Sequence, residues 1–387
     1  MKKEETFNKK FFMLIFALLF EPILCIKYNL TNYIYILGAV FSFLSILFIT
    51  YKKNSKIDTN IFILLALRIE LLLPTLLYPG GDIMKWGYMS LIMISLFLIL
   101  NYTCKIDYRK TILVANKLFG ILLILNLLSY IFFSNGVYYD STSYQSLYLL
   151  GIRTRFTDYA YVGLILTELN YALKNCSKKI YLLSSIICIL NVILPKISTA
   201  IVAIIIFYSL KIIFSKQKHK KLLTYNNVLI TSWCTNFLII FFNIQMILNW
   251  LFVKFFNKTA NLTGRTEIWE IAWDTLLHKP ILGYGVRNDG SFVYVRGKMW
   301  QAHNQIIQLL YDGGIIGMLL FIIMLFIFGK NLKFNGDDND KLRQIIIFGL
   351  GGFFIIMITE ISSYYLPIYL LLFLGYFIKY NREENRK

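Results

Sequence analysis

Residues 344–380 read QIIIFGLGGFFIIMITEISSYYLPIYLLLFLGYFIKY, and Glu360 is the only acidic or basic residue in this stretch before Lys379. A single helix of about 36 residues would reach about 54 Å at 1.5 Å per residue, well beyond the roughly 30 Å apolar core of a bilayer. Ser362-Ser363 and the nearby Pro367 supply a break. The stretch therefore predicts two membrane-spanning helices, 344–362 and 364–380.

Apolar runs of similar length recur along the whole chain of 387 residues, of which 57% are hydrophobic and only 16% are charged. A soluble domain carries about a quarter charged residues. The apolar side chains surround whole helices, which is typical of helices packed in lipid or in a buried bundle. The sequence predicts an all-α, polytopic helical membrane protein with about twelve transmembrane helices. The expected spans are 11–26, 33–50, 61–78, 86–102, 111–133, 159–173, 180–195, 197–214, 228–250, 305–329, 344–362 and 364–380.

The distribution of basic residues predicts the orientation of these helices. A net charge of +19 would suggest a nucleic-acid partner in a soluble protein, but most Lys and Arg here lie in short loops between spans. With the N-terminus inside, 25 basic residues fall in cytoplasmic segments and five in the short outer segments. We therefore expect a multi-pass protein of the inner (plasma) membrane with both termini cytoplasmic, no cleaved signal peptide, membrane lipid as a partner and no nucleic acid.

Two predicted outer loops are much longer than the rest, 134–158 and 251–302. The second is the longest connection, and it divides the chain into 1–250, an N-terminal set of about nine spans, 251–304, a large late extracytoplasmic loop, and 305–387, the C-terminal spans and tail. Because short loops elsewhere indicate tight packing, we expect function in the long loops.

The most specific sequence pattern begins in the second loop. It consists of Gly264-Arg265-Thr266-Glu267-Ile268-Trp269, then Pro280-Ile281-Leu282-Gly283-Tyr284-Gly285, then His303-Asn304, and finally Gly314-Ile315-Ile316-Gly317. Arg265 heads an amphipathic segment, with Ile268, Trp269, Ala272 and Leu276 on one face, that would lie along the membrane interface. Pro280, Gly283 and Gly285 then turn the chain, and His303 lies where the loop re-enters the membrane.

These residues resemble a known family. GR-x-x-x-W, P-x-x-G-x-G, and HN followed by Gly-x-x-Gly are similar to the shared C-terminal region of the O-antigen ligase and Wzy-type polymerase superfamily, and the resemblance covers about 264–320. It implies a GT-C-like ligase/polymerase fold. It also implies glycosyl transfer at the outer membrane face from an undecaprenyl-pyrophosphate-linked oligosaccharide. Because Arg and Lys would neutralise the pyrophosphate and the outer loops contain no acidic cluster, we expect no metal and no cofactor.

The resemblance implies roles for three motif residues. By its place in the motif, His303 resembles the family's general base, and a neutral imidazole with a pKa near 6.5 suits proton abstraction at neutral pH. Arg265 resembles a motif arginine that pairs with pyrophosphate oxygens. Asn304 would orient the imidazole or bind sugar. Without the motif, His303 would be a plain helix-start residue and Arg265 a headgroup anchor.

Four further basic residues are candidates for substrate binding. Arg153 and Arg155 match the family in location and charge, although basic loop residues are common. Lys196 stands in Pro195-Lys196-Ile197-Ser198, where the resemblance leads us to expect a Ser-Arg pair. Arg68, within a span, would either pair with a carboxylate on another helix or line a pyrophosphate cavity.

Three functions remain open. The leading interpretation is a polymerase of lipid-linked repeat units of an O-antigen, capsule or exopolysaccharide, with a chain-length regulator and a flippase as further partners. The first alternative is a ligase that attaches finished glycan to another acceptor. The second is a flippase or transporter, but the functional-looking residues gather in one outer loop instead of lining two halves.

Overall fold

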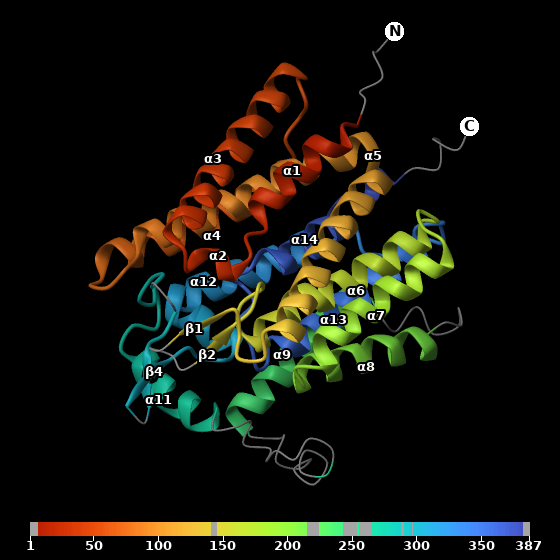
Figure 1. The fold of residues 1–387 in the computed structure, drawn as a ribbon. Helices are drawn as coiled ribbons and strands as arrows, with labels where there is room; N and C mark the ends of the chain where they lie inside the picture. Colours follow the sequence, from red (N-terminus) through yellow and green to blue (C-terminus); the bar gives the residue numbers. More distant parts are fainter. Residues whose placement is uncertain are drawn as a thin grey trace.

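The computed structural model describes residues 7–140, 145–214, 224–242, 254, 265–287, 290–295 and 297–381. Most of them form α-helices that run side by side, with two short hairpins at one end of the bundle (Figure 1). Several predicted features lie outside the described residues. They are Gly264 of the first motif, most of 251–264, the basic stretch 215–223 and the tail 382–387.

The first four helices are α1 (Lys9–Leu19), α2 (Ile23–Ile26), α3 (Asn29–Lys52) and α4 (Ile61–Leu77). The expected span 11–26 is interrupted, because α1 ends at Leu19 and α2 begins only after Pro22. Proline has no N–H and its ring clashes with the preceding helical turn, so it kinks or breaks a helix, and at Pro22 the helix is broken. The prediction of one uninterrupted span was therefore wrong at this point.

Helix α5 (Ile83–Phe132) comprises 50 residues and is kinked at Asp107, whose backbone is not helical (φ −160°, ψ 97°). The Asp107 side chain accepts a hydrogen bond from the Lys110 N–H at 2.9 Å, as an N-terminal cap does. The kink therefore divides α5 into the two expected spans, 86–102 and 111–133.

The other helices of the described residues are α6 (Phe156–Ala172), α7 (Lys178–Ile193), α8 (Ser198–Ile213), α9 (Tyr225–Phe242), α11 (Arg265–Leu277), α12 (Gln305–Gly329), α13 (Asp340–Ile356) and α14 (Leu366–Phe377). Every residue of α14 is buried, and so is nearly every residue of α6, which places both helices at the centre of the bundle. Helix α13 ends before the predicted break at Ser362-Ser363, and α14 begins just before Pro367, so the break comprises residues 357–365.

The connections contain structure that the all-α prediction did not include. Strands β1 (Tyr138–Asp140) and β2 (Gln145–Leu147) pair antiparallel, as do β3 (Val293–Val295) and β4 (Lys298–Trp300). Single 3-10 turns lie at η1 (Arg153–Arg155) and η5 (Ile378–Tyr380). Strands of three residues are too short to produce a recognisable alternation in the sequence.

Apart from the interrupted span 11–26 and the earlier end of α13, most described helices lie close to the expected spans, and several are strongly apolar, in agreement with a helical membrane protein. Among the described residues, three helices are long and apolar enough to cross a membrane, Leu30–Lys52, Ile83–Phe132 and Gln305–Gly329. The number of crossings therefore stays a prediction.

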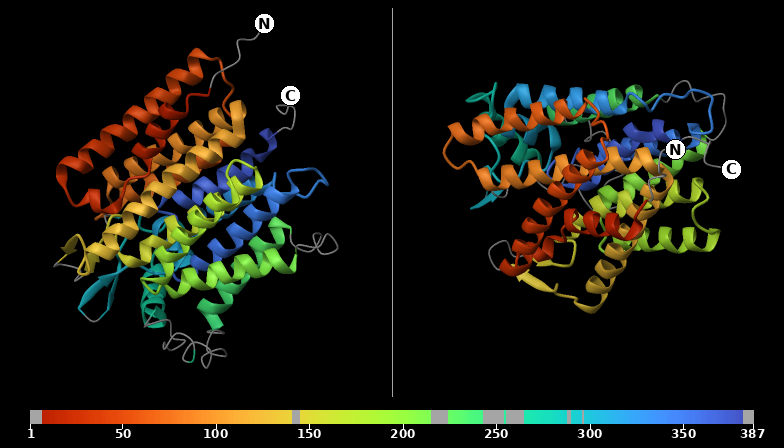
Figure 2. Two further views of the ribbon diagram at one scale, coloured as in Figure 1. Left: turned by 45° about the vertical axis from the view of Figure 1, so that its right-hand side comes forward. Right: turned by 90° about the horizontal axis from the view of Figure 1, so that it is seen from above.

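Connections predicted to share one side of the membrane meet at the same end of the bundle. Lys379 forms an ion pair with Asp58 at 3.0 Å, and Asn339 contacts Asn381, so three predicted cytoplasmic segments lie together. Both hairpins and α11 lie at the other end (Figures 1 and 2).

Candidate active site around His303

Helix α11 carries the motif arginine at its first residue. Its buried side chains are Ile268, Trp269, Ala272 and Leu276, the same four that the sequence predicts as its apolar face. They pack against β3, Ala302 and the start of α12, and the Trp269 Nε1–H donates to the Ala302 carbonyl at 2.9 Å. The face predicted to lie along the membrane interface is thus covered by protein. This packing fixes Arg265 relative to the loop that carries His303.

The P-x-x-G-x-G motif binds the backbone of α12 at a break in that helix. Gly314 has φ +58° and ψ −158°, and a Cβ there would lie 2.2 Å from the Ile281 carbonyl oxygen. The Tyr284 and Gly285 N–H groups donate to the carbonyls of Tyr311 and Asp312, at 2.7 and 2.9 Å. In the other direction, the Ile315 N–H donates to the Pro280 carbonyl at 2.8 Å. Glycine is required here because two backbones approach closely, one of them in a left-handed conformation.

Asn304 is the N-cap of α12. Its Oδ1 accepts from the N–H groups of Ile306 and Ile307, at 2.8 and 3.2 Å. Its Nδ2 donates to Asn236 Oδ1 at 2.8 Å and to the Ile358 carbonyl at 3.0 Å. The side chain is fully buried and joins α12 to α9 and to the α13–α14 link, so its amide atoms are engaged in structural bonds.

The next residue, Gln305, attaches the α13–α14 link to the same place. Its Oε1 accepts from the N–H groups of Ser362 and Ser363, at 2.8 and 2.9 Å, and its own N–H donates to the Met357 carbonyl at 3.0 Å. The link is therefore held on both sides of Glu360, next to His303.

Glu360 is the acidic centre of the site. Its Oε1 lies 2.9 Å from Arg265 Nη2, and the two side chains are 6% and 16% exposed. A buried carboxylate is stable only when a cation is paired with it. The ion pair therefore holds the Arg265 guanidinium beside Glu360.

Arg155 approaches from the first long loop. Its guanidinium donates to the Ile361 carbonyl at 3.0 Å and to Gln301 Oε1 at 3.1 Å, and it lies 4.4 Å from the ring centre of Tyr365. Asp158 Oδ2 is 3.8 Å away, one helical turn further along the chain. Arg155 thus contacts Gln301, two residues before His303, and Ile361, the residue after Glu360.

His303 lies among these charges with a left-handed backbone (φ +47°) and a half-buried ring. Its Nδ1 is buried and has no hydrogen-bond partner among the described residues. The pKa of His303 falls to about 4, chiefly because burial disfavours the charged ring, while Glu360 raises this pKa and Arg265 and Arg155 lower it. The imidazole is therefore neutral at pH 7, with a pKa below the ordinary value expected from the sequence.

The other predicted binding residues lie at different distances from this group. Arg153 is exposed, two positions before the buried Arg155. Lys196 is also exposed, but the nearby Thr199 hydroxyl lies 3.0 Å from that of Thr359, which precedes Glu360. Lys196 is thus at the edge of the site.

Arg68 belongs to a second buried cluster beside the first. Its guanidinium donates to Ser90 Oγ at 2.7 Å and to the Trp86 carbonyl at 3.0 Å, and it forms no ion pair with a carboxylate in the described part of the chain. The neighbouring Asp312 accepts from the Tyr364 hydroxyl at 2.5 Å and from Gln308 at 3.0 Å. The α13–α14 link, through Tyr364, connects this cluster to that of His303.

A family model of known proteins matches the part of the chain that contains much of this site. Residues 183–322 match the family model described as O-antigen ligase. This segment contains Lys196, Arg265 and His303, whereas Arg155 and Glu360 lie outside it.

Curated relatives give the same indication. A protein named as a polysaccharide ligase from Rickettsia conorii is 27% identical over 100 residues, 23% of this chain and 24% of the relative. The exopolysaccharide production protein ExoQ of Rhizobium meliloti is 24% identical over 140 residues, 30% of this chain and 31% of the relative. The chain thus spans less than a third of each relative's length, and no solved structure matches it. These findings confirm the predicted resemblance to an O-antigen ligase-type family and agree better with a ligase than with a polymerase.

Proposed function

From its O-antigen ligase-type family, we propose that this protein is a membrane glycosyltransferase of the ligase kind. It transfers a finished glycan from an isoprenoid-pyrophosphate carrier, undecaprenyl pyrophosphate by the resemblance, to a hydroxyl group of another acceptor. The reaction takes place at the outer face of the inner membrane, and both termini of the protein are cytoplasmic.

One observation carries this proposal. Arg155, Arg265 and His303, which come from two separate loops, converge on the link that contains Glu360. Transfer from a pyrophosphate carrier requires cations at the leaving group and a base at the attacking hydroxyl. The cluster brings both kinds of group together from segments far apart in the sequence.

The chemistry assigns one task to each residue. Arg265 and Arg155 bind the pyrophosphate oxygens, because a guanidinium forms paired, charge-assisted bonds to phosphate. As the bond between the anomeric carbon and the phosphate oxygen breaks, the acceptor oxygen bonds to that carbon and His303 takes its proton. The pyrophosphate departs with the electron pair of the broken bond. In this single displacement the acceptor oxygen attacks from the face of the sugar opposite the leaving group, so the anomeric carbon is inverted.

The arginines neutralise the leaving group, so we propose that turnover requires neither a divalent metal nor a cofactor. Lys196 and Arg153, both exposed at this end, attract the anionic donor to the site. Asn304 positions His303 by capping α12, and Arg68 supports the adjacent cluster.

The test uses full-length protein in detergent with an isoprenoid-pyrophosphate-linked oligosaccharide. Release of the isoprenoid pyrophosphate reports cleavage of the donor, and labelled glycan reports the product. A ligase transfers glycan only after an acceptor lipid extract is added, whereas a polymerase elongates the donor without it. Growth of the donor alone into a ladder would replace the ligase with the polymerase.

Histidine variants supply the matched control. His303→Ala is expected to lower turnover by about 10² to 10⁴. His278→Ala removes an exposed histidine just after α11, whose Nδ1 lies 2.8 Å from the Asp274 carbonyl oxygen, and is expected to leave turnover unchanged. Near-normal turnover by His303→Ala would refute the base assignment, and activity lost in chelator and restored by Mg²⁺ would refute metal independence.

A further inference from the structure

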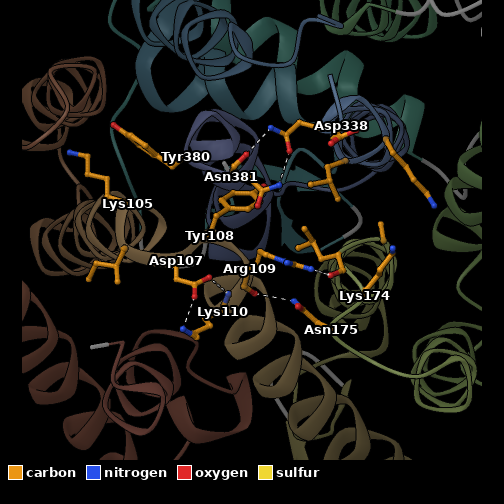
Figure 3. A pocket seen from close by; sticks show the side chains of 16 residues that line it. Lys105, Asp107, Tyr108, Arg109, Lys110, Lys174, Asn175, Asp338, Tyr380 and Asn381 are labelled. Carbon is orange, nitrogen blue, oxygen red and sulfur yellow. Dashed lines mark hydrogen bonds and ion pairs between the residues drawn. The ribbon is translucent and has the colours of Figure 1, made fainter. Parts of the chain in front are cut away.

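A cavity of about 740 Å³ lies at the end of the bundle opposite His303. Its walls come from the kink of α5, the α6–α7 link, the start of α13 and the residues after α14 (Figure 3). Helix α6 begins next to Arg155 and ends at this cavity, and its 17 residues span about 25 Å at 1.5 Å per residue. The cavity is therefore separate from the candidate active site, and it lies at the end predicted to face the cytoplasm.

The wall at the α5 kink is held in a defined shape. The Arg109 guanidinium donates to the Leu173 carbonyl, and Asn175 Nδ2 donates to the Arg109 carbonyl at 3.1 Å (Figure 3). Lys174, between these two contacts, has a left-handed backbone (φ +57°). The Nε of Arg109 is buried and has no hydrogen-bond partner among the described residues.

The charge of the lining is strongly basic. Five cationic side chains and two carboxylates line the cavity: Lys105, Arg109, Lys110, Lys174 and Lys341, with Asp107 and Asp338. Lys110 is paired with Asp107 at 2.7 Å. Within the described ranges, no carboxylate lies at ion-pair distance from the other four cations. A concave surface of one charge sign concentrates the field and attracts an oppositely charged ligand.

We propose that this cavity binds a phosphate-bearing anion. Guanidinium and ammonium groups bind phosphate oxygens through short charge-assisted bonds, and the lining offers both kinds, from Arg109 and from the lysines. Exposed Lys174 and Lys341 line the cavity from different elements, the α6–α7 link and α13, and each offers an ammonium group to the anion. The volume is in the range of sites that hold a small organic ligand. The phosphate belongs either to the headgroup of an anionic lipid at the membrane surface or to a soluble compound.

The experiment separates these two sources with purified full-length protein. In the lipid arm, nanodiscs of phosphatidylglycerol are compared with nanodiscs of phosphatidylcholine, and retained lipid is measured by native mass spectrometry. In the soluble arm, binding of inorganic pyrophosphate is measured by calorimetry in a neutral detergent. No glycan donor is present, so the result is independent of the proposed function.

The test variant is Lys174→Gln/Lys341→Gln, in which two exposed cavity lysines lose their charge. The control is Lys178→Gln/Lys333→Gln, which removes the same charge from exposed lysines outside the cavity lining. We expect the test variant to bind the anion about tenfold more weakly or worse, and the control to bind it within about twofold of the parent. Binding in either arm should also weaken with salt, because the charges are partly exposed.

Retention of phosphatidylglycerol that depends on the cavity lysines identifies a headgroup, and dependent binding of pyrophosphate identifies a soluble anion. The proposal is overturned if neither anion binds, or if the test and control variants lose the same affinity.

Discussion

Arg265 and Glu360 are 95 positions apart in the sequence, and they form an ion pair of 2.9 Å beside His303. Glu360 thus holds a guanidinium that the proposed reaction uses for pyrophosphate. The same carboxylate raises the pKa of His303 and so favours the imidazolium that forms during transfer. It also repels an anionic donor, so it acts in opposite directions on donor binding and on turnover.

Glu360→Gln separates these two effects. Removal of the negative charge should strengthen donor binding and lower KM. Arg265 then loses its ionic partner and the imidazolium loses a stabilising charge, so kcat should fall by about tenfold, equivalent to roughly 1.4 kcal/mol. Steady-state kinetics with varied donor concentration measure both parameters.

Glu168→Gln is the matched control, because Glu168 on α6 is also a buried carboxylate paired with a cation, Lys211 at 2.7 Å, but lies away from the site. Its KM should equal that of the parent protein. An unchanged KM and kcat in Glu360→Gln would show that the ion pair has no part in transfer.

Asn304→Ala tests whether this residue acts through the helix it caps. The substitution removes a cap of two N–H groups and two Nδ2 bonds, and loss of a cap costs about 1 kcal/mol. We expect a lower unfolding temperature and a lower kcat with unchanged donor KM. A large rise in KM at an unchanged unfolding temperature would instead indicate direct sugar binding.

Gly314→Ala tests the contact between the P-x-x-G-x-G motif and α12. The added Cβ would meet the Ile281 carbonyl at 2.2 Å in a left-handed backbone, which costs on the order of 1 to 3 kcal/mol. Thermal unfolding of the detergent-solubilised protein should occur several degrees lower. Gly120→Ala, where a Cβ has no neighbour within 4 Å, should unfold at the parent temperature or above. Equal unfolding temperatures for the two variants would contradict the role given to Gly314.

The sequence predicted the helices well because all-round apolar runs and turn residues are local signals. The buried face of α11 and the turn at Gly283 are likewise local, and the structure contains both. Assembly of the site is not local. In the sequence, Glu360 stood out only as the single charged residue of an apolar stretch. Its pairing with Arg265 depends on the long break 357–365, which Gln305 holds in place.

The choice between Arg153 and Arg155 also required the structure. Both stand in one 3-10 turn, yet Arg155 is buried and Arg153 is exposed. A carboxylate three positions after Arg155, Asp158, was the available signal, since residues at this spacing meet on a helix. The tertiary partners of Arg155, at Ile361 and Gln301, have no counterpart in the local sequence.

The orientation in the membrane is tested by cysteine labelling of intact cells whose outer barrier is permeabilised. The native cysteines at 25, 104, 176, 188 and 234 are first replaced. Met299→Cys, 53% exposed on β4, should react with an impermeant thiol reagent. Tyr51→Cys, 87% exposed near Lys52, should react only after lysis. The reverse pattern would invert the topology and place the candidate site in the cytoplasm.

The pH dependence of transfer tests His303 through its surroundings. A base with a pKa of about 4 stays neutral down to that pH, so kcat/KM of the parent should fall only as the pH drops toward about 4. Arg265 lowers this pKa, and its removal in Arg265→Gln should move the acid limb to higher pH. Glu360 raises it, so Glu360→Gln should move the limb to lower pH. If His303 had only a structural role, neutralising Arg265 and neutralising Glu360 would not shift the acid limb of kcat/KM in opposite directions. Acid limbs at the same pH in all three proteins would exclude His303 as the titrating base, and Asp312 would become the next candidate.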